Sequence, residues 1–351
     1  MSAPQALMKG EHIDQRGRAE LEFLQALRSG LAPLRGRIRQ QIDASGALEQ
    51  PYSGIQELRA RVDGALRDSQ ELAVVRAVLR WARASATPRA VAAFERGKAL
   101  LQPLASPAGN VLSLVDTVPA YWDYSFHMTE GGWDGHPDMG FIHHELIYYY
   151  LLARLYPGDL FEQRAQVARA CPSDSYRHII DLGSGTGQYS LKLAQAYPMA
   201  RLTLVDLSAT QLRYALRRAE DHQLEVQAVR AAAEDTRLPA QSADLVTSFI
   251  MFHEMPASVI AQVFVESFRL LEPGGHIHFA DVAPYSERPA YKAWQDDWDA
   301  DNANEPWWRE AATVDLGAAA ALAGFVDIDQ RALGADGYPW VITATKPYPQ
   351  P

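Results

Sequence analysis

The stretch HIIDLGSGTG, residues 178–187, decides the fold of this 351-residue chain. Its first half contains the aliphatic residues Ile179, Ile180 and Leu182, a pattern typical of a strand buried on both faces of a sheet. Its second half holds three glycines, which permit a tight turn because glycine has no Cβ. A helix is expected to begin at about Gln188. The stretch therefore predicts a parallel strand whose turn lets a ligand approach the backbone at a helix N-terminus.

Strand and helix patterns alternate after this turn. The apolar run from Arg201 to Val205 predicts the next strand, and a segment with helical periodicity follows it. Such alternation favours a parallel sheet with helices on both faces. Asp206 ends the second strand, nineteen residues after Gly187, where its carboxylate can accept hydrogen bonds from ribose hydroxyls. Together these features predict a site for a nucleoside cofactor.

The residue after the third glycine distinguishes two kinds of cofactor. A dinucleotide fingerprint needs a small residue at position 188, which is Gln188 here. The pattern D-x-G-x-G-x-G instead resembles the class I methyltransferases that use S-adenosyl-L-methionine. The resemblance continues through residues 242–254 and through the turn 271–275 before the strand His276 to Asp281. It ends with an antiparallel pair near 324–328 and 340–347, so that it covers about residues 177–347.

This resemblance implies an α/β fold with a doubly wound, seven-stranded Rossmann-like sheet, and S-adenosyl-L-methionine as cofactor. Asp181 and the glycine turn would hold its methionine part, and Asp206 its ribose. Relatives usually carry Asp at the position of Ala232, so adenine recognition is left to the backbone of Ala233, to Glu234 or to Asp235. The expected cofactor-binding residues are Asp181, Gly183, Ser184, Gly185, Gly187, Asp206, Leu207, Ala233, Glu234, Ser248 and Phe249.

The chain divides into two predicted domains. Residues 1–170 show helix-period apolar positions at 19–27, 55–66 and 72–81, and a further helix is expected from about Gly140 to Leu155, ending near Pro157-Gly158. We expect this helical N-terminal domain to cover the substrate and to offer a surface through which a homodimer could form. Residues 171–351 form the predicted cofactor-binding catalytic domain, with an aromatic insertion at about 284–311.

Composition limits the partners. The net charge of −10 disfavours nucleic acid, although the helical part is net positive. The single cysteine, Cys171, excludes an intramolecular disulfide and a multi-thiolate metal site. The chain contains no uninterrupted apolar run of about 18 residues. We therefore expect a soluble, cytoplasmic protein with no membrane partner.

Catalytic candidates follow the fourth strand. Methyl transfer from a sulfonium is an in-line displacement that depends on alignment, and it needs a base only when the nucleophile must lose a proton. His253 is expected to be that base, with Glu254 orienting it, since imidazole titrates near neutral pH. The alternative is that His253 caps the next helix or contacts the cofactor.

An aromatic and histidine-rich segment, about 121–145, is expected to line the substrate site. His143 and His144 are adjacent and point about 100° apart on a helix. No His pair at i, i+4 spacing occurs in the segment, so no metal site is assigned. The expected substrate residues are Tyr121, Tyr124, His127, Trp133 and His143, together with Asp281, Tyr285 and Trp294 from the second half of the chain.

The sequence thus predicts a methyltransferase acting on an oxygen or nitrogen of a small, aromatic or lipid-like metabolite. Aromatic covers favour such a substrate over a macromolecule, which generally needs an open, charged groove. Two alternatives stay open: an RNA methyltransferase that uses the basic N-terminal helices, and a protein of this fold that binds the cofactor without methylating. The sequence does not identify the acceptor.

Overall fold

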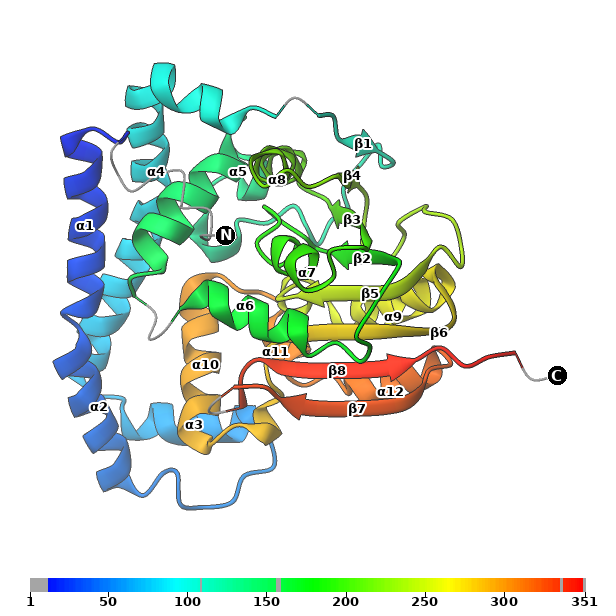
Figure 1. Ribbon diagram of the computed structural model, residues 1–351. Coiled ribbons are helices and arrows are strands. Elements are labelled where there is room, and N and C mark those ends of the chain that lie inside the picture. Colours follow the sequence, from blue (N-terminus) through cyan, green and yellow to red (C-terminus); the bar gives the residue numbers. More distant parts are fainter. Residues whose placement is uncertain (1–11, 108, 156–158, 335–336, 350–351) are drawn as a thin grey trace.

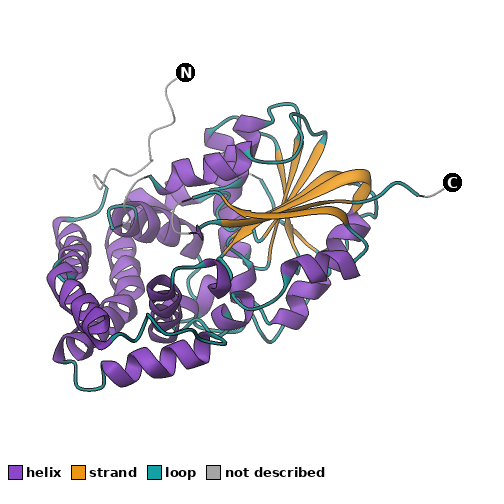
Figure 2. Ribbon diagram, turned by 90° about the horizontal axis from the view of Figure 1, so that it is seen from below, coloured by secondary structure: helices purple, strands orange, loops and turns teal. Residues whose placement is uncertain are grey.

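The computed structural model describes residues 12–107, 109–155, 159–334 and 337–349. A group of long helices lies beside an α/β unit whose sheet has helices on both faces (Figures 1 and 2). The predicted α/β fold class with an N-terminal helical region is therefore confirmed. Among the helices of the described residues, none combines the length and the apolarity that crossing a bilayer requires.

The sheet of the described residues has eight strands, in the order β1-β4-β3-β2-β5-β6-β8-β7. Neighbours from β1 to β6 pair in parallel, whereas β8 is antiparallel to both β6 and β7. Six of these strands lie where the sequence placed them; β4, implied only by the expected seven-stranded sheet, and the two-residue β1 at the edge were not located from the sequence. The strands are β1 (Leu112–Ser113), β2 (His178–Leu182), β3 (Arg201–Asp206), β4 (Val226–Arg230), β5 (Ala243–Phe249), β6 (Leu271–Asp281), β7 (Val326–Ala332) and β8 (Trp340–Thr345).

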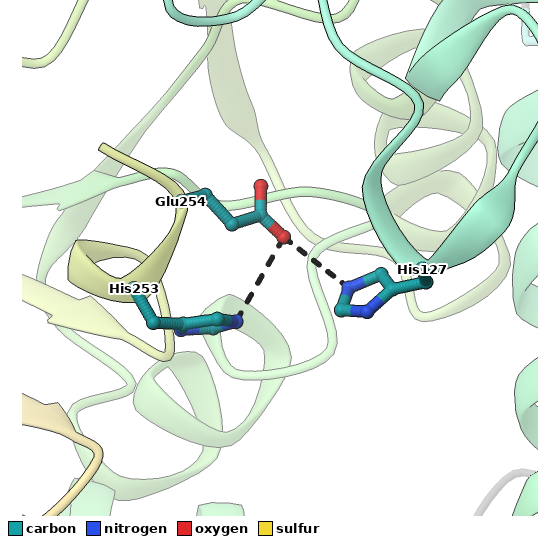
Figure 3. Close-up of side chains that lie close together, drawn as sticks. All are labelled: His127, His253 and Glu254. Atoms are coloured by element: carbon teal, nitrogen blue, oxygen red, sulfur yellow. Dashed lines mark ion pairs between the residues drawn. The ribbon is translucent and has the colours of Figure 1, made fainter. Parts of the chain in front are cut away.

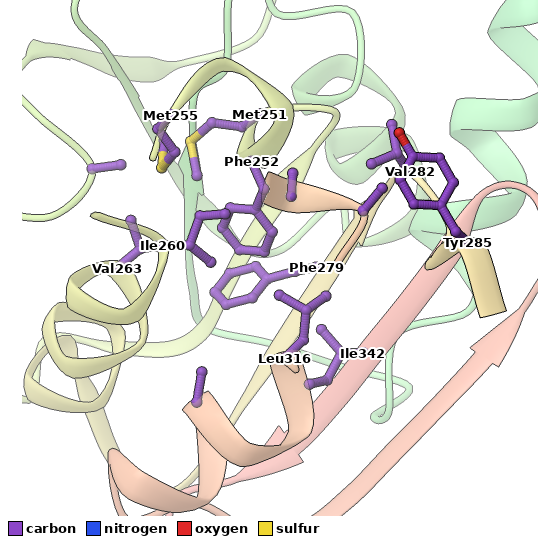
Figure 4. Close-up of a cluster of buried hydrophobic side chains, with 14 of the residues drawn as sticks. Met251, Phe252, Met255, Ile260, Val263, Phe279, Val282, Tyr285, Leu316 and Ile342 are labelled. Carbon is purple, nitrogen blue, oxygen red and sulfur yellow. The ribbon is translucent and has the colours of Figure 1, made fainter. Parts of the chain in front are cut away.

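The sheet is buried on both faces because its strands alternate between two apolar clusters. Ile179 belongs to the cluster that includes residues of α6, α7 and α8, while Ile180 belongs to the cluster that includes residues of α9 and α12. Figure 4 shows the second cluster, with Phe252 and Phe279 among the aliphatic residues. These helices are α6 (Leu160–Arg169), α7 (Ser190–Ala196), α8 (Ala209–Asp221), α9 (Ala257–Leu270) and α12 (Leu316–Leu322).

The helical part is built on α4, a 36-residue helix that Ser69 caps by accepting a hydrogen bond from the backbone of Leu72. The expected helix from Gly140 to Leu155 exists as α5 and a wider π-helical coil, η3; its expected end at Pro157-Gly158 lies outside the described residues. The helices here are α1 (Gln15–Ser29), α2 (Ala32–Ser45), α3 (Ile55–Ala65), α4 (Gln70–Ala105), α5 (Met139–Phe141) and η3 (Ile142–Leu152), with the single turns η1 (Phe126–Met128) and η2 (Gly132–Asp134).

Two elements join the predicted domains. Helix α6 precedes the predicted boundary at residue 170, but it packs on the sheet, and the carbonyl of Val167 lies 3.0 Å from Nε2 of His278. The aromatic insertion forms η5 (Tyr285–Glu287), α10 (Ala290–Ala303) and α11 (Trp308–Ala311). Helix α10 packs against α3, where Trp294 Nε1 donates to Asp63 at 2.9 Å. The insertion therefore ties the sheet to the N-terminal helices.

Asp297 on α10 is the charged centre of this junction. Its carboxylate is buried, pairs with Arg59 of α3 and Arg309 of α11, and accepts from Tyr285 Oη at 2.7 Å. Burial alone would raise the pKa of Asp297, but the hydrogen bonds from Arg309 and Tyr285 keep it below its ordinary value. The fold thus satisfies a buried carboxylate with partners from three elements.

We expect Asp297→Asn to lower the free energy of unfolding by about 3 kcal/mol or more, because it removes the buried carboxylate that Arg59 and Arg309 share. Arg59 then keeps only the more exposed carboxylates of Asp63 and Asp301. Denaturant unfolding measures this change. Asp43→Asn, which removes the exposed Arg39–Asp43 pair on α2, is the matched control and should cost less than about 1 kcal/mol. Equal effects of the two substitutions would contradict a structural role for this junction.

Candidate functional site

A cavity of about 760 Å³ lies where β2 and β5 meet. Chain connections run in opposite directions from this point of the sheet, which is where open α/β sheets bind ligands. The glycine turn, Asp206 and the loop after β5 form one part of the wall, and residues between Tyr121 and His143 form another. Helix α6 contributes further lining, including Arg164. Both halves of the chain therefore build the cavity.

The three glycines of the turn have positive φ angles, which favour glycine. A Cβ on Gly183 would lie 2.6 Å from the sulfur of Met251, whereas one on Gly185 would meet nothing within 4 Å. Gly183 and Gly185 line the cavity. Gly187 instead faces Ala215 of α8, where a Cβ would lie 3.3 Å away. The backbone is therefore most open to a ligand at Gly185.

Two carboxylates stand at the ends of neighbouring strands, where Asp181 is buried and Asp206 is half-buried. Asp206 accepts hydrogen bonds from the backbone N–H groups of Gly185 and Ser208, both at 2.8 Å. Asp181 accepts from the hydroxyl of Ser190 at 2.5 Å. Burial raises the pKa of Asp181 to about 7 and that of Asp206 to about 6. Both line the cavity, where they favour a ligand that carries hydroxyl donors or positive charge.

The segment expected to cover the substrate is fastened beside these carboxylates. Tyr121 donates to both carboxylate oxygens of Glu234 at 2.8 Å. Asp134 accepts from the backbone of Thr210 at 3.1 Å and from the hydroxyl of Ser208 at 2.6 Å, at the start of α8. Among the candidates for adenine, Ala233 lines the cavity, Glu234 is engaged by Tyr121, and Asp235 is exposed.

His253 lies in the loop after β5 and is anchored by Asp281. Its Nδ1 is 3.2 Å from Asp281 Oδ1, while the other oxygen of Asp281 accepts from the backbone of Met251 and Phe252 at 2.6 Å. Glu254 was expected to orient the ring, but its nearest oxygen is 4.0 Å from Nε2 of His253. The orienting carboxylate is therefore Asp281, which the sequence suggested only as part of the pocket wall.

The other imidazole nitrogen of His253 belongs to a group that we call the His–Glu cluster: His127, His253 and Glu254 (Figure 3). One oxygen of Glu254 lies 3.5 Å from Nε2 of His127 and 4.0 Å from Nε2 of His253. The second oxygen accepts from Trp133 Nε1 at 3.1 Å. All four residues line the cavity.

The expected substrate residues separate into two sets. Tyr121, Trp133, His127 and His143 line the cavity, and burial lowers the pKa of His143 to about 3. The structure places four others elsewhere: Asp281 behind His253, Tyr124 against Asn304, Tyr285 against Asp297, and Trp294 against Asp63. Each of these four side chains is held outside the cavity by a hydrogen-bond partner in or beside the aromatic insertion or in the loop after β5.

The expected cofactor residues are also distributed unevenly. Ser248 is buried within β5, and neither it nor Gly187 or Glu234 lines the cavity, whereas the other eight do. Sequence reasoning missed Arg164 and Trp308, whose ring centroid is 5.2 Å from that of His253. Trp308 is within the aromatic insertion, so its residue type was a signal. Arg164 had none, because α6 was assigned to the other domain.

Several buried polar atoms of the lining suit a polar ligand. Ser184 Oγ, Gln188 Oε1 and Gln211 Nε2 have no hydrogen-bond partner within the described part of the chain. Buried polar groups are nearly always hydrogen-bonded. Together with the open face of Gly185 and the carboxylate of Asp206, they fit a nucleoside cofactor that spans the ends of β2 and β3.

Comparisons with known proteins agree with this reading of the fold. Residues 179–275 match the family model of the methyltransferase domain. The ribosomal RNA large subunit methyltransferase G of Shewanella amazonensis is 36% identical over 113 residues, which is 30% of this chain and 30% of that protein. The malonyl-[acyl-carrier protein] O-methyltransferase of Hahella chejuensis is 36% identical over 110 residues, covering 30% of this chain and 36% of that one. The chain thus spans about a third of the length of these curated relatives.

Among solved structures, phosphoethanolamine N-methyltransferase 2 of Haemonchus contortus in complex with S-adenosyl-L-methionine is similar, with a TM-score of 0.46 and 17% identity. The match covers 66% of this chain and 61% of that chain.

Proposed function

We propose that this chain, in which residues 179–275 match the family model of the methyltransferase domain, uses S-adenosyl-L-methionine to move a methyl group to an oxygen or nitrogen of a small, aromatic or lipid-like molecule. The observation that carries the proposal is the single cavity that joins the glycine turn and Asp206 to the aromatic wall and the His–Glu cluster. Its volume of about 760 Å³ lies in the range of small-molecule sites.

At the cofactor end, the chain supplies acceptors and an open backbone. When bound, S-adenosyl-L-methionine supplies a methyl group on a positively charged sulfur. Asp206 accepts from its ribose hydroxyls in our proposal, and Gly185 lets it approach the turn. The carboxylates of Asp181 and Asp206 attract the positive charge of the ligand. This attraction offsets the free-energy cost of keeping the two carboxylates ionised away from water.

At the acceptor end, the chain supplies alignment and exclusion of water. Trp133, His143 and Trp308 provide flat walls with few freely rotating bonds. The acceptor lies against the His–Glu cluster, on the side of the cavity formed by the loop after β5. Fixing the acceptor there makes the in-line displacement effectively unimolecular.

A small acceptor is favoured over RNA because several N-terminal arginines are already paired with carboxylates. Carboxylates already pair with several of the arginines that could have formed a phosphate-binding face. These arginines are Arg37, Arg39, Arg59 and Arg61.

One similar protein is by its name a ribosomal RNA methyltransferase, so RNA belongs in the same assay. The protein is incubated with labelled methyl donor and either a metabolite extract or total RNA, and mass spectrometry finds the product. Label in RNA alone, or no label at all, would contradict the proposal.

Asp206→Ala should weaken binding of S-adenosyl-L-methionine and of its demethylated product by about 10- to 100-fold. The reason is that hydrogen bonds to a charged group contribute about 1.5–3 kcal/mol. Calorimetry measures both affinities. Asp329→Ala, which removes an exposed carboxylate on β7 outside the cavity lining, is the control and should change neither. Tighter binding of NAD than of the sulfonium would refute the cofactor assignment.

Affinity for S-adenosyl-L-methionine should fall as the pH drops from about 8 to 5. The pKa values of Asp181 and Asp206 are raised to about 7 and about 6, so both lose their charge in this range. Each carboxylate that must be ionised costs about tenfold in affinity per pH unit below its pKa. Nearby Glu254 and Asp134 also raise the pKa of Asp206. Asp206→Asn should remove the lower part of the titration.

The same two groups act on the stability of the ligand-free protein with the opposite sign. Their folded-state pKa values lie above the ordinary value of 3.8, so their contribution to stability is present at low pH and is lost as the pH rises through about 6 and 7. An affinity that stays constant from pH 8 to pH 5 would show that neither carboxylate faces the cofactor.

His253→Ala should lower turnover by about 10²- to 10⁴-fold, the range for a positioned group that assists proton transfer, and should leave cofactor affinity within about twofold. Turnover with the identified acceptor and calorimetry with the cofactor measure the two quantities. His276→Ala, in the first half of β6, is the matched control. If His253→Ala lost cofactor affinity instead, His253 would belong to the cofactor site.

A further inference from the structure

We propose that His127, His253 and Glu254 bind a divalent first-row transition metal at the acceptor end of the cavity. Each offers one ligand atom, and the three atoms lie within 4.8 Å of one another. Metal–ligand bonds to imidazole and carboxylate are about 2.0–2.2 Å long, so ligands of one ion stand about 3–4 Å apart. The Glu254 oxygen meets this spacing toward both imidazoles, at 3.5 and 4.0 Å.

The surroundings of the two imidazoles support a metal site. Metal-binding histidines usually donate their second ring N–H to a carboxylate, which fixes the ring and its tautomer. Here Nδ1 of His253 faces Asp281 at 3.2 Å, and Nδ1 of His127 pairs with the buried carboxylate of Glu305. Both rings therefore turn Nε2 toward the same oxygen of Glu254 (Figure 3).

Each member of the cluster is held by a separate contact. Trp133 donates to the second oxygen of Glu254 at 3.1 Å, which leaves the first oxygen toward the histidines. Asp281 accepts from the backbone N–H groups of Met251 and Phe252, just before His253, and from that of its own neighbour Val282. His127 and Met128 both have positive φ, at 54° and 61°. Such strain in two consecutive residues is kept only where the surrounding structure requires it, and it gathers at functional sites.

Two imidazoles and one carboxylate form a ligand set that suits zinc and related divalent ions, with further positions left for water or substrate. The cluster lines the cavity, so those positions face the acceptor. A bound ion of this kind lowers the pKa of a coordinated hydroxyl, and the acceptor's proton then leaves to solvent. This role for the metal rests on the proposed function, whereas metal binding itself does not. In the metal-bound protein, His253 is a ligand rather than the general base.

The test uses the full-length protein after treatment with a chelator. Zn²⁺ and Co²⁺ are titrated separately, bound metal is counted by elemental analysis, and Co²⁺ is followed by its visible absorption. We expect one ion per chain and a cobalt spectrum typical of nitrogen and oxygen ligands in low coordination number. Affinity should fall by at least 100-fold in His127→Ala, His253→Ala and Glu254→Gln.

Glu305→Gln should weaken binding by about 10- to 100-fold, as removal of a carboxylate behind a ligating histidine does. His143→Ala is the matched control, because His143 lines the same cavity outside the cluster, and it should keep full affinity. Thermal unfolding of each variant checks that it folds. Glu254→Gln, which preserves side-chain volume, keeps the test valid if a histidine variant does not fold.

A folded wild-type protein that binds no metal would overturn the inference, and so would metal binding that survives in His127→Ala/His253→Ala. The cluster would then be an ion-paired network with a protonated His127. Cofactor affinity measured on the same samples separates the two proposals. Cofactor binding without metal binding refutes the metal site alone, and metal binding without cofactor binding refutes the proposed function alone.

Discussion

The placing of buried and half-buried carboxylates at the carboxyl edge of the sheet is the constraint on which the rest of this structure depends. Asp181, Asp206 and Asp281 lie at or next to the ends of β2, β3 and β6, and all three line or flank the cavity. A buried carboxylate is costly unless hydrogen bonds satisfy it. The turn after β2 and the start of α8 donate to Asp206, the loop after β5 donates to Asp281, and the hydroxyl of Ser190 on α7 donates to Asp181. The polar end of the sheet and the shape of its loops therefore have one cause.

Local pattern was enough to predict the centre of this arrangement. The glycine turn, the two strands on either side of it and the position of Asp206 are all features of short segments, because a buried strand and a left-handed turn limit which residues can occupy them. The eighth strand could not be predicted in this way. A two-residue pairing such as β1 depends on where the N-terminal half happens to lie against β4, and its own residues carry no strand signal.

The acceptor end was harder to predict because its residues meet only through tertiary structure. His127 and His253 are far apart in the sequence, and the partner of His253 turned out to be Asp281 on a neighbouring strand instead of adjacent Glu254. Aromatic content alone did not separate cavity from core. Trp294 and Tyr285 belong to a segment that also carries Trp308, yet polar partners on α3 and α10 hold them in the junction between the two halves. Aromatic residue type thus predicted which segment contributes to the cavity wall. Hydrogen-bond partners determined which of its side chains line the cavity and which lie in the junction.

The contact of Asp134 with the start of α8 links two parts of the chain that are far apart in sequence. Helix α8 begins beside Asp206, and the backbone N–H groups of Ala209 and Thr210 at its start donate to Asp134. Asp134 lies in the same segment as Tyr121. Moving the segment from Tyr121 to Asp134 away from the sheet would remove these acceptors from the first turn of α8, although its cap Ser208 would still accept from Gln211. It would also break the bond between Tyr121 and Glu234. The segment and the first turn of α8 are thus held by one set of contacts, so that neither can shift without the other losing hydrogen bonds.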